Sequence, residues 1–427
     1  MPRVLLLATT TGYQTRSFGE SAERLGVDLI FATDRCHVLE DPWSDRALPI
    51  RFADEDWSTY TLLEFAKTTP IDGVLAVGDR PTVIAGHVLE GLGLPGHAAE
   101  AARTARNKLL SRTRLRAASM RVPFFHPVAV DTDVQALAEV IPFPAVLKPL
   151  VLSGSRGVVR VNNREELVAA FYRLRSLFQA PDIRGARDES SEMILVEGFI
   201  EGHEYAVEAV MSHGALKVLA IFDKPDRLDG PFFEETIYVT PPVIPPQVEA
   251  AIVSAVAQSA FALGLRHGPI HAECRVLGED VWMLEVAARP IGGLCARSLR
   301  FTRNEPGGPV ISLEELLLRH AIGERVDAWS RESTASGVMM IPIPRRGVFR
   351  RAAGLEQARA VCGVDDVRIT AKTDQLLLPL PEGASYLGFI FARGQDARAV
   401  ERALREAHAR LRFTIDPEVP VVQSHHG

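Results

Sequence analysis

The stretch "HAECRVLGEDVWMLEVAARPIGG", residues 271–293, has the pattern of two β-strands joined by a short polar turn. Apolar and polar residues alternate along both arms, as expected for half-buried strands. Glu273 and Glu285 interrupt these arms, and Arg289 and a pair of glycines follow. Carboxylates seldom lie in a sheet core without a partner, so this hairpin is the first candidate for a functional site.

The hydrophobic pattern of the hairpin predicts its register. The apolar side chains expected on the core face are Cys274, Val276, Trp282 and Leu284. A three-residue loop, residues 278–280, brings them together by pairing Val276 with Trp282. The same register places Glu273 opposite Glu285, whereas a slip of one residue would put the two acids on opposite faces.

Like charges directly across a sheet are destabilising, so the acid pair needs compensation. A shared proton is one solution, and a hard divalent cation with oxygen ligands is another. Mg²⁺ commonly uses one or two carboxylates together with substrate phosphates. Arg289, at the end of the second strand, suits a phosphoryl or carboxylate oxygen.

An upstream segment, "KPLVLSGSRGV" (residues 148–158), supports the phosphate interpretation. Gly154 and Gly157 allow backbone N–H groups to converge on an anion, and Lys148 precedes them at the end of a strand. The spacing is not that of a Walker loop. A plain hairpin with a surface lysine is the alternative.

The segment "LVEGFIEGHEYAVEAV" (residues 195–210) predicts a strand, an extended linker and a second strand. Backbone groups of such a linker can bind an adenine edge in an apolar cleft. Glu197 ends the first strand, and Glu204 is placed to accept hydrogen bonds from ribose hydroxyls. A hairpin with exposed acids is the alternative.

The composition is that of a globular protein, with 427 residues, 47% hydrophobic, 24% charged and a net charge of −6. This charge gives no reason to expect nucleic-acid binding. The four cysteines form no C-x-x-C pair, which favours a reduced, cytoplasmic compartment. The first apolar run is too short for a signal peptide, and no segment is long enough to span a membrane.

Strands alternate with helix patterns over the first hundred residues, which indicates a doubly wound α/β unit. A basic helix is expected over residues 101–121, with Lys108 as its candidate phosphate ligand. We expect an exposed connection at 180–192 and an irregular, proline-rich loop at 222–246. Residues 330–420 are expected to form a small α+β domain packed on the rest.

Taken in order, these segments resemble the ATP-grasp superfamily. The resemblance covers "NKLLSRTRL", "VLKPLVLSGSRGV", "VEGFIEGHEY" and the hairpin with its arginine, within residues 1–330. The later segments "SGVMMIPIPRRGVF" and "PLPEGASYLGFIFARG" look like the extra domain of the L-amino-acid ligase branch, which makes dipeptides. The resemblance implies three regions: an N-terminal α/β domain (1–105), an ATP-grasp domain (106–330, lobes about 115–200 and 201–330) and a C-terminal α+β domain (331–427).

The resemblance also implies a role for each candidate residue. The residues that would contact ATP are Lys108, Lys148, Ser153, Gly154, Ser155, Gly157, Glu197, Phe199, Ile200 and Glu204. The ligands of Mg²⁺, or alternatively Mn²⁺, would be Glu273 and Glu285. Arg289 and Lys148 would act in catalysis. The residues near the substrates would be Glu235, His271, Arg289 and Gly292, with Lys224 as a further candidate.

The implied reaction is ATP-dependent ligation of a small carboxylate to an amine through an acyl phosphate, without nucleic acid or membrane partners. Many family members have E-x-N after the second acid, but Ala287 replaces the asparagine here, which leaves a second metal ion in doubt. A carboxylase or purine-pathway ligase, and a non-catalytic nucleotide-binding module, are the alternatives. The oligomeric state is left open, a homodimer being the commonest arrangement.

Overall fold

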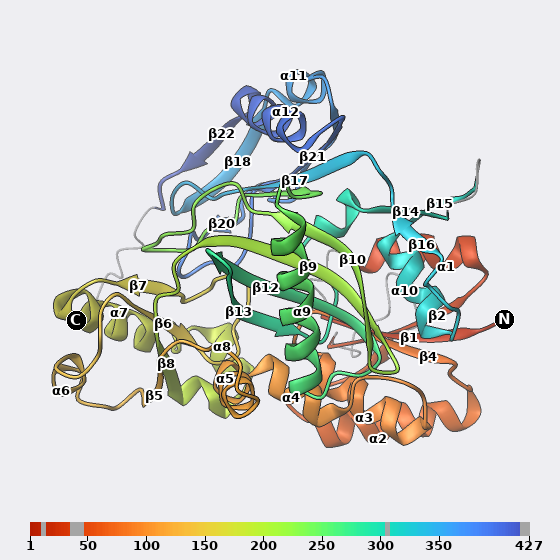
Figure 1. The fold of residues 1–427 in the computed structure, drawn as a ribbon, viewed down its shortest axis with the longest axis horizontal. Coiled ribbons are helices and arrows are strands. Elements are labelled where there is room, and N and C mark those ends of the chain that lie inside the picture. Colours follow the sequence, from red (N-terminus) through yellow and green to blue (C-terminus); the bar gives the residue numbers. More distant parts are fainter. Residues whose placement is uncertain (10–13, 35–46, 304–307, 419–427) are drawn as a thin grey trace, which may run out of the picture.

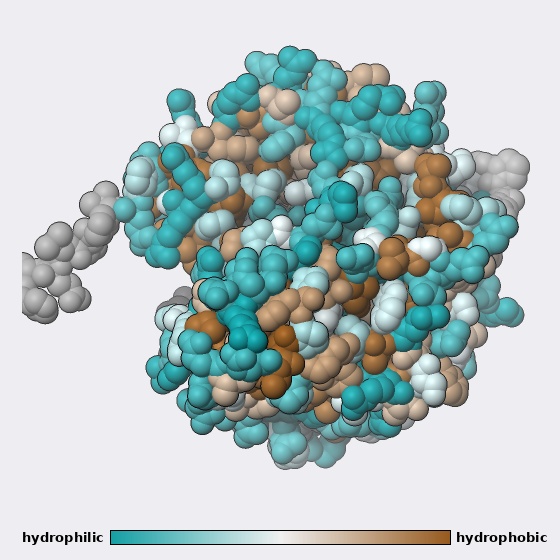
Figure 2. Space-filling model, turned by 60° about the vertical axis from the view of Figure 1, so that its left-hand side comes forward, coloured by the Kyte–Doolittle hydropathy of each residue, from teal (hydrophilic) through white to brown (hydrophobic). Residues whose placement is uncertain are grey.

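The computed structural model describes residues 1–9, 14–34, 47–303 and 308–418 (Figure 1). Cys36 and the C-terminal "SHHG" lie outside these ranges. The other three cysteines, Cys274, Cys295 and Cys362, are free thiols. None of the described helices combines the length and apolar character that crossing a membrane requires. Hydrophilic residues predominate on the face shown in Figure 2.

The N-terminal region forms the expected parallel sheet, in the order β3-β2-β1-β4. Its elements are β1 (Arg3–Ala8), α1 (Thr15–Leu25), β2 (Asp28–Thr33), β3 (Leu48–Pro49), α2 (Glu55–Thr68), β4 (Gly73–Val77) and α3 (Thr82–Leu92). The continuous apolar run in β1 is buried, as is typical of a parallel strand covered by helices on both faces. The carboxyl ends of β1 and β4 point toward the rest of the molecule.

The basic segment is two helices and not the single helix expected over residues 101–121. They are α4 (Ala99–Arg106) and α5 (Lys108–Ala117). Asn107 separates them, because its backbone is extended and its side chain accepts hydrogen bonds from the N–H groups of Leu109 and Leu110. This cap makes Lys108 the first residue of α5, where its backbone N–H donates to Leu150 next to the glycine-containing loop.

A small lobe follows, with a four-stranded antiparallel sheet in the order β5-β8-β6-β7. Its elements are β5 (Phe125–Ala129), α6 (Val134–Ala138), β6 (Ala145–Pro149), β7 (Val159–Val161), α7 (Arg164–Leu177), α8 (Pro181–Gly185), the 3₁₀ helix Glu189–Glu192 and β8 (Met193–Gly198). The segment 180–192 is therefore partly helical, which the expectation of a simple exposed connection missed. Lys148 lies near the end of β6, as expected, and the glycine-containing segment connects β6 to β7.

The largest sheet has eight strands in the order β13-β12-β9-β10-β11-β17-β21-β19. These are β9 (His203–Ser212), β10 (Ala215–Asp223), β11 (Ile237–Thr240), β12 (Gly268–Leu277), β13 (Asp280–Ala287), β17 (Ala335–Ile341), β19 (Val364–Ile369) and β21 (Gly388–Gly394), with α9 (Pro246–Ala262) packed on one face (Figure 1). The irregular loop expected over 222–246 thus contains a strand, β11. Through the pairing of β11 with β17, the C-terminal strands continue this sheet.

The remaining elements pack around this sheet. They are the 3₁₀ helix Cys295–Ser298, β14 (Arg300–Arg303), β15 (Val310–Ser312), α10 (Leu313–Ala321), β16 (Trp329–Arg331), β18 (Gly347–Ala353), α11 (Leu355–Arg359), β20 (Leu376–Leu377), α12 (Ala397–Arg410) and β22 (Arg412–Asp416). Helices α11 and α12 pack on the C-terminal strands of the large sheet, β17, β19 and β21 (Figure 1).

The hairpin β12–β13 brings the two acids together by a route different from the expected one. Leu277 pairs with Asp280, so the turn has two residues, Gly278 and Glu279, instead of three. Gly278 has a φ of +63°, a conformation that glycine adopts without strain. The pairing of Val276 with Trp282 is consequently wrong, since Val276 faces Val281.

A β-bulge restores the register of the acids. Cys274 pairs with Met283, but its neighbour Glu273 pairs with Glu285, so Leu284 is an extra residue on β13. The apolar partners of β12 are therefore Met283 and Val281, and not Trp282 and Leu284 as expected. Leu284 and Glu285 both line the cleft described below. The expected pairing of the acids is confirmed.

Candidate active site

A cleft of about 490 Å³ lies between the small lobe and the large sheet. The N-terminal region contributes Asp79 to its wall, and the C-terminal region contributes Tyr386, which precedes β21, and Phe389 of β21. The cleft brings together all the candidate site residues expected from sequence except Gly157, which lies below the surface of the loop. Lys224 is buried next to the carboxylates of Glu204, Glu235 and Glu273, and 3% of its surface is exposed.

Arg289 stands at the end of β13, beside the acid pair. Its Nη2 atom lies 3.8 Å from Glu285 Oε1. Its Nε and Nη2 atoms also donate to the two carboxylate oxygens of Asp79, at 2.9 and 3.1 Å. Burial lowers the pKa of Arg289, but the charge of Asp79 outweighs this and raises it, so Arg289 stays a cation.

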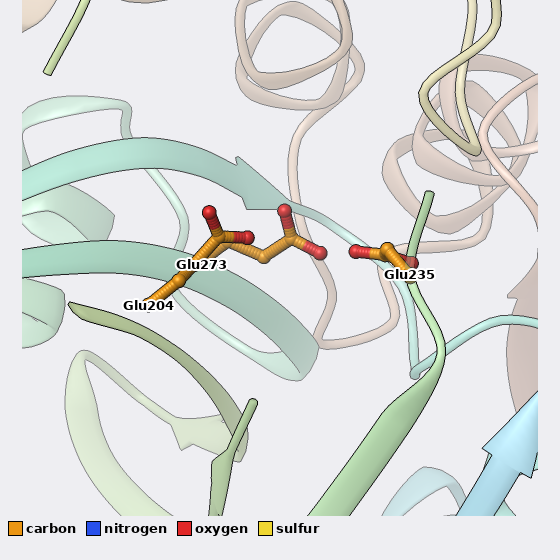
Figure 3. Close-up of side chains that lie close together, drawn as sticks. All are labelled: Glu204, Glu235 and Glu273. Atoms are coloured by element: carbon orange, nitrogen blue, oxygen red, sulfur yellow. The ribbon is translucent and has the colours of Figure 1, made fainter. Parts of the chain in front are cut away.

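Three carboxylates converge on the floor of the cleft, from Glu204, Glu235 and Glu273 (Figure 3). One carboxylate oxygen from each of the three residues lies within 4.8 Å of the oxygens from the other two. The ammonium of Lys224 lies among them, at 2.7 Å from Glu204, 2.7 Å from Glu235 and 3.3 Å from Glu273. Burial lowers the pKa of Lys224, but the carboxylates raise it well above its usual value. It is therefore charged.

His271 links the acid pair to a deeply buried carboxylate. Its Nδ1 atom lies 3.1 Å from Glu208 and its Nε2 atom 3.4 Å from Glu273. Glu208 is fully buried and also accepts from the backbone N–H of Ile291. Burial lowers the pKa of His271, but both carboxylates raise it to about 9. His271 lies across the hairpin from Ala287. Ala287 is the residue that replaces the asparagine found in many family members.

Lys148 and Glu197 form a buried ion pair at the strand ends of the small lobe. Lys148 Nζ lies 2.5 Å from Glu197 Oε2, and Arg112 binds the same carboxylate through two nitrogens. Burial raises the pKa of Glu197, but the two cations outweigh it and lower the pKa to about 2. Glu197 thus orients Lys148, which lines the cleft. The Glu197 carboxylate is bound by both Lys148 and Arg112.

The linker after β8 forms one wall of the cleft, and Arg275 supports it. The guanidinium of Arg275 donates to the carbonyl of Ile200 at 2.6 Å and to Glu204 at 2.9 Å. It also lies over the rings of Phe199 and Phe233, 5.0 and 5.7 Å from their centroids. The linker is therefore fixed in place, with aromatic surface available to a flat ring system.

The glycine-containing loop, residues 151–157, contacts the C-terminal region. Gly157 donates its N–H to Pro381, and Arg156 donates to the carbonyl of Glu382. Lys108 Nζ donates to the carbonyl of Leu152 at 2.7 Å. The loop is thus held over the cleft from two sides, with Ser153, Gly154 and Ser155 on its lining.

Several residues of the site were not identified from sequence. Glu208 could have been found, because it shares the face of β9 with Glu204, and Arg112 follows Lys108 at the i+4 position of one helix. Asp79 gave a weaker signal, its position after a parallel strand, where open α/β sheets bind ligands. The apolar residues of the C-terminal strands that line the cleft, Met340 and Phe389, had no signal.

Comparison with protein-family models places three matches along the chain. Residues 19–96 match an ATP-grasp N-terminal domain, residues 141–298 an ATP-grasp domain, and residues 339–416 the L-amino acid ligase C-terminal domain 2. The chain is an ATP-dependent carbon–nitrogen ligase of the ATP-grasp superfamily. The match at residues 339–416 shows that the C-terminal region is similar to that of L-amino acid ligases.

Three proteins illustrate what the chain as a whole is similar to. The crystal structure of an L-amino acid ligase from Bacillus licheniformis has a TM-score of 0.81 and 26% identity, covering 97% of this chain and 99% of that one. An uncharacterized protein of Sinorhizobium fredii is 24% identical over 98% of this chain and 84% of its own length. Human carnosine synthase 1 is 27% identical over 54% of this chain, which spans only 29% of that synthase.

Proposed function

We propose that this ligase joins two amino acids into a dipeptide, using ATP and Mg²⁺ and passing through an acyl phosphate. One observation carries the proposal. A single cleft joins the Lys148 and Lys108 side to the facing acids Glu273 and Glu285, and continues into an apolar end formed by Met340, Tyr386 and Phe389. The first part suits a nucleotide, and the second suits an amino-acid side chain.

The residues present fit a divalent cation. Glu273 and Glu285 offer carboxylate oxygens from facing strand positions, and their mutual repulsion favours a cation between them. Bound there, Mg²⁺ would supply charge neutralisation for phosphoryl transfer. Glu273 is ionised, because Lys224 and His271 lower its pKa well below the usual value despite burial.

In the proposed reaction, a substrate carboxylate oxygen attacks the γ-phosphorus of ATP, and the bond to the leaving oxygen of ADP breaks. Lys148 and Arg289 hold the charge that develops on the phosphoryl oxygens. The amine of the second amino acid then attacks the acyl carbonyl, and phosphate leaves as the amide forms.

The chain also provides for the exclusion of water from the acyl phosphate. The loop 151–157 closes one side and is tied to residues 381 and 382. The segment before β11 also contacts the small lobe, since Phe232 forms a β-bridge with Val159, and its residues Leu228 and Phe233 line the cleft.

The experiment is a phosphate-release screen over pairs of L-amino acids with ATP and Mg²⁺, followed by mass spectrometry of the products. We expect ADP, phosphate and a dipeptide for at least one pair. If ATP binds but no pair yields ADP, the ligase proposal fails. A product other than a dipeptide would show that the amine substrate is not an amino acid.

A further inference from the structure

Asp79 reaches the active site from a region outside the nucleotide domain. It follows β4 of the N-terminal sheet, and its side chain is 13% exposed at the rim of the cleft. Its partner, Arg289, is 9% exposed and follows β13, two residues beyond the last residue of that strand. The two residues are 210 positions apart in sequence, so only the docking of the N-terminal sheet brings them together.

The contact between them fixes an orientation. Both carboxylate oxygens of Asp79 accept hydrogen bonds, one from Nε and one from Nη2, and this two-point contact fixes the guanidinium plane. Arg289 Nη1 donates in addition to the carbonyl of Pro290 at 3.1 Å. These bonds use three of the five N–H groups of arginine and leave two for a substrate oxygen.

Asp79 is itself held firmly. Its backbone carbonyl accepts from the backbone N–H and the hydroxyl of Thr82, at 3.3 and 2.7 Å, in the first turn of α3. Burial raises the pKa of Asp79, but the charge of Arg289 outweighs it and lowers the pKa, so the carboxylate is ionised. Gln14, also in the N-terminal region, donates to the carbonyl of Ile291. The N-terminal region is thus hydrogen-bonded to the segment after β13 at two residues, Arg289 and Ile291.

We propose that Asp79 is a positioning residue for phosphoryl transfer, aiming the two remaining N–H groups of Arg289 at the transferring group. The inference rests on the proposed function and extends it to a residue of the N-terminal domain. A merely structural joint between the domains would affect stability. A positioning residue affects the rate of the chemical step, because a displacement of about 1 Å at a reacting group can cost about 100-fold in rate.

The test compares Asp79→Asn, which keeps the shape and removes the charge, with Asp72→Asn. Asp72 immediately precedes β4, so it lies at the opposite end of the same strand, and it accepts from the backbone N–H of Arg3 at 2.7 Å. We expect Asp79→Asn to lower kcat by about 100-fold, with KM for ATP within threefold of wild type. Asp72→Asn should leave both constants unchanged, and Asp79→Glu should recover part of the lost kcat.

Two further measurements make the result decisive. In a double-mutant cycle, Asp79→Asn combined with Arg289→Lys should lose no more activity than Arg289→Lys alone, because the carboxylate acts through the guanidinium. Phenylglyoxal labelling of Arg289, read by mass spectrometry without turnover, should be faster in Asp79→Asn than in wild type.

Wild-type kcat in Asp79→Asn, additive losses in the cycle or unchanged labelling would overturn the positioning role while leaving the ligase proposal intact. Absence of ADP formation by the wild-type protein would instead overturn the proposed function. The labelling result still decides whether Asp79 holds Arg289 in that case.

Discussion

Glu273 and Glu285 face each other across a hairpin whose second strand has one residue more than its partner between the turn and the acid pair. The bulge at Leu284 turns Glu285 into the cleft while Met283 remains in the core at 2% exposure. This arrangement places both carboxylates beside Arg289.

The acid pair predicts a strong requirement for Glu285. Glu285→Gln keeps the side-chain length and removes the charge, so we expect turnover to fall by about 100-fold or more, with weaker Mg²⁺ dependence of the remaining rate. Steady-state ADP formation at several Mg²⁺ concentrations measures this. Glu279→Gln, in the exposed turn of the same hairpin, is the control and should behave as wild type. A near-normal rate for Glu285→Gln would refute the metal assignment.

The buried ion pair of Arg112 and Glu197 predicts a stability effect. Arg112→Leu removes the guanidinium and leaves the 2%-exposed carboxylate with Lys148 as its cation, at a cost of about 3–5 kcal/mol in the free energy of unfolding. Urea denaturation measures this cost. Arg114→Leu, on the exposed face of the same helix, should change the free energy by less than about 0.5 kcal/mol. Equal effects of the two substitutions would contradict the role of the pair.

His97 predicts a pH dependence of stability. Burial lowers its pKa from 6.5 to about 4, and His267 adds to this, while hydrogen bonds at Pro269 and Gly268 act in the opposite direction. Between these two values the unfolded chain binds more protons at His97 than the folded one, so the stability that His97 contributes falls as the pH drops from 6.5, and this contribution levels off below 4.

The contribution of His97 is about 3 kcal/mol, measurable as the pH dependence of the urea midpoint. His97→Gln should make the dependence shallower over this window, and His267 and His320, whose pKa values burial also lowers to about 4, keep part of it. An unchanged pH profile would show that His97 titrates normally in the folded protein.

Gly157 predicts a steric effect at the base of the glycine-containing loop. Its φ is +74°, and an added Cβ would lie 2.7 Å from Pro149 and 2.9 Å from Leu174. Gly157→Ala should therefore lower the free energy of unfolding by about 1–3 kcal/mol and weaken ATP binding, because the loop must shift. Gly185→Ala, which meets no atom within 4 Å, should be neutral or slightly stabilising. Calorimetry of ATP binding and thermal unfolding distinguish the two variants.

Local sequence pattern determined much of the site. The continuous apolar run of β1 and the glycines at 154 and 157 predicted their structures correctly, because periodicity and backbone freedom are local properties. The order of lysines, acids and arginine identified the superfamily, because its motifs follow one another in a fixed order along the sequence. The pairing of Glu273 with Glu285 followed from alternation, although the turn length that produced it was wrong.

The tertiary structure decided which partners these side chains have. Glu197 was expected from sequence as an ATP contact, and the structure adds the two cationic partners of its carboxylate, Arg112 and Lys148. The strand β11 was hidden in a proline-rich loop, and it forms only because β10 and β17 pair with its two edges. Asp79 meets Arg289 only through the docking of the N-terminal sheet. Such contacts join residues far apart in the chain, and their energy depends on packing and burial that no local pattern encodes.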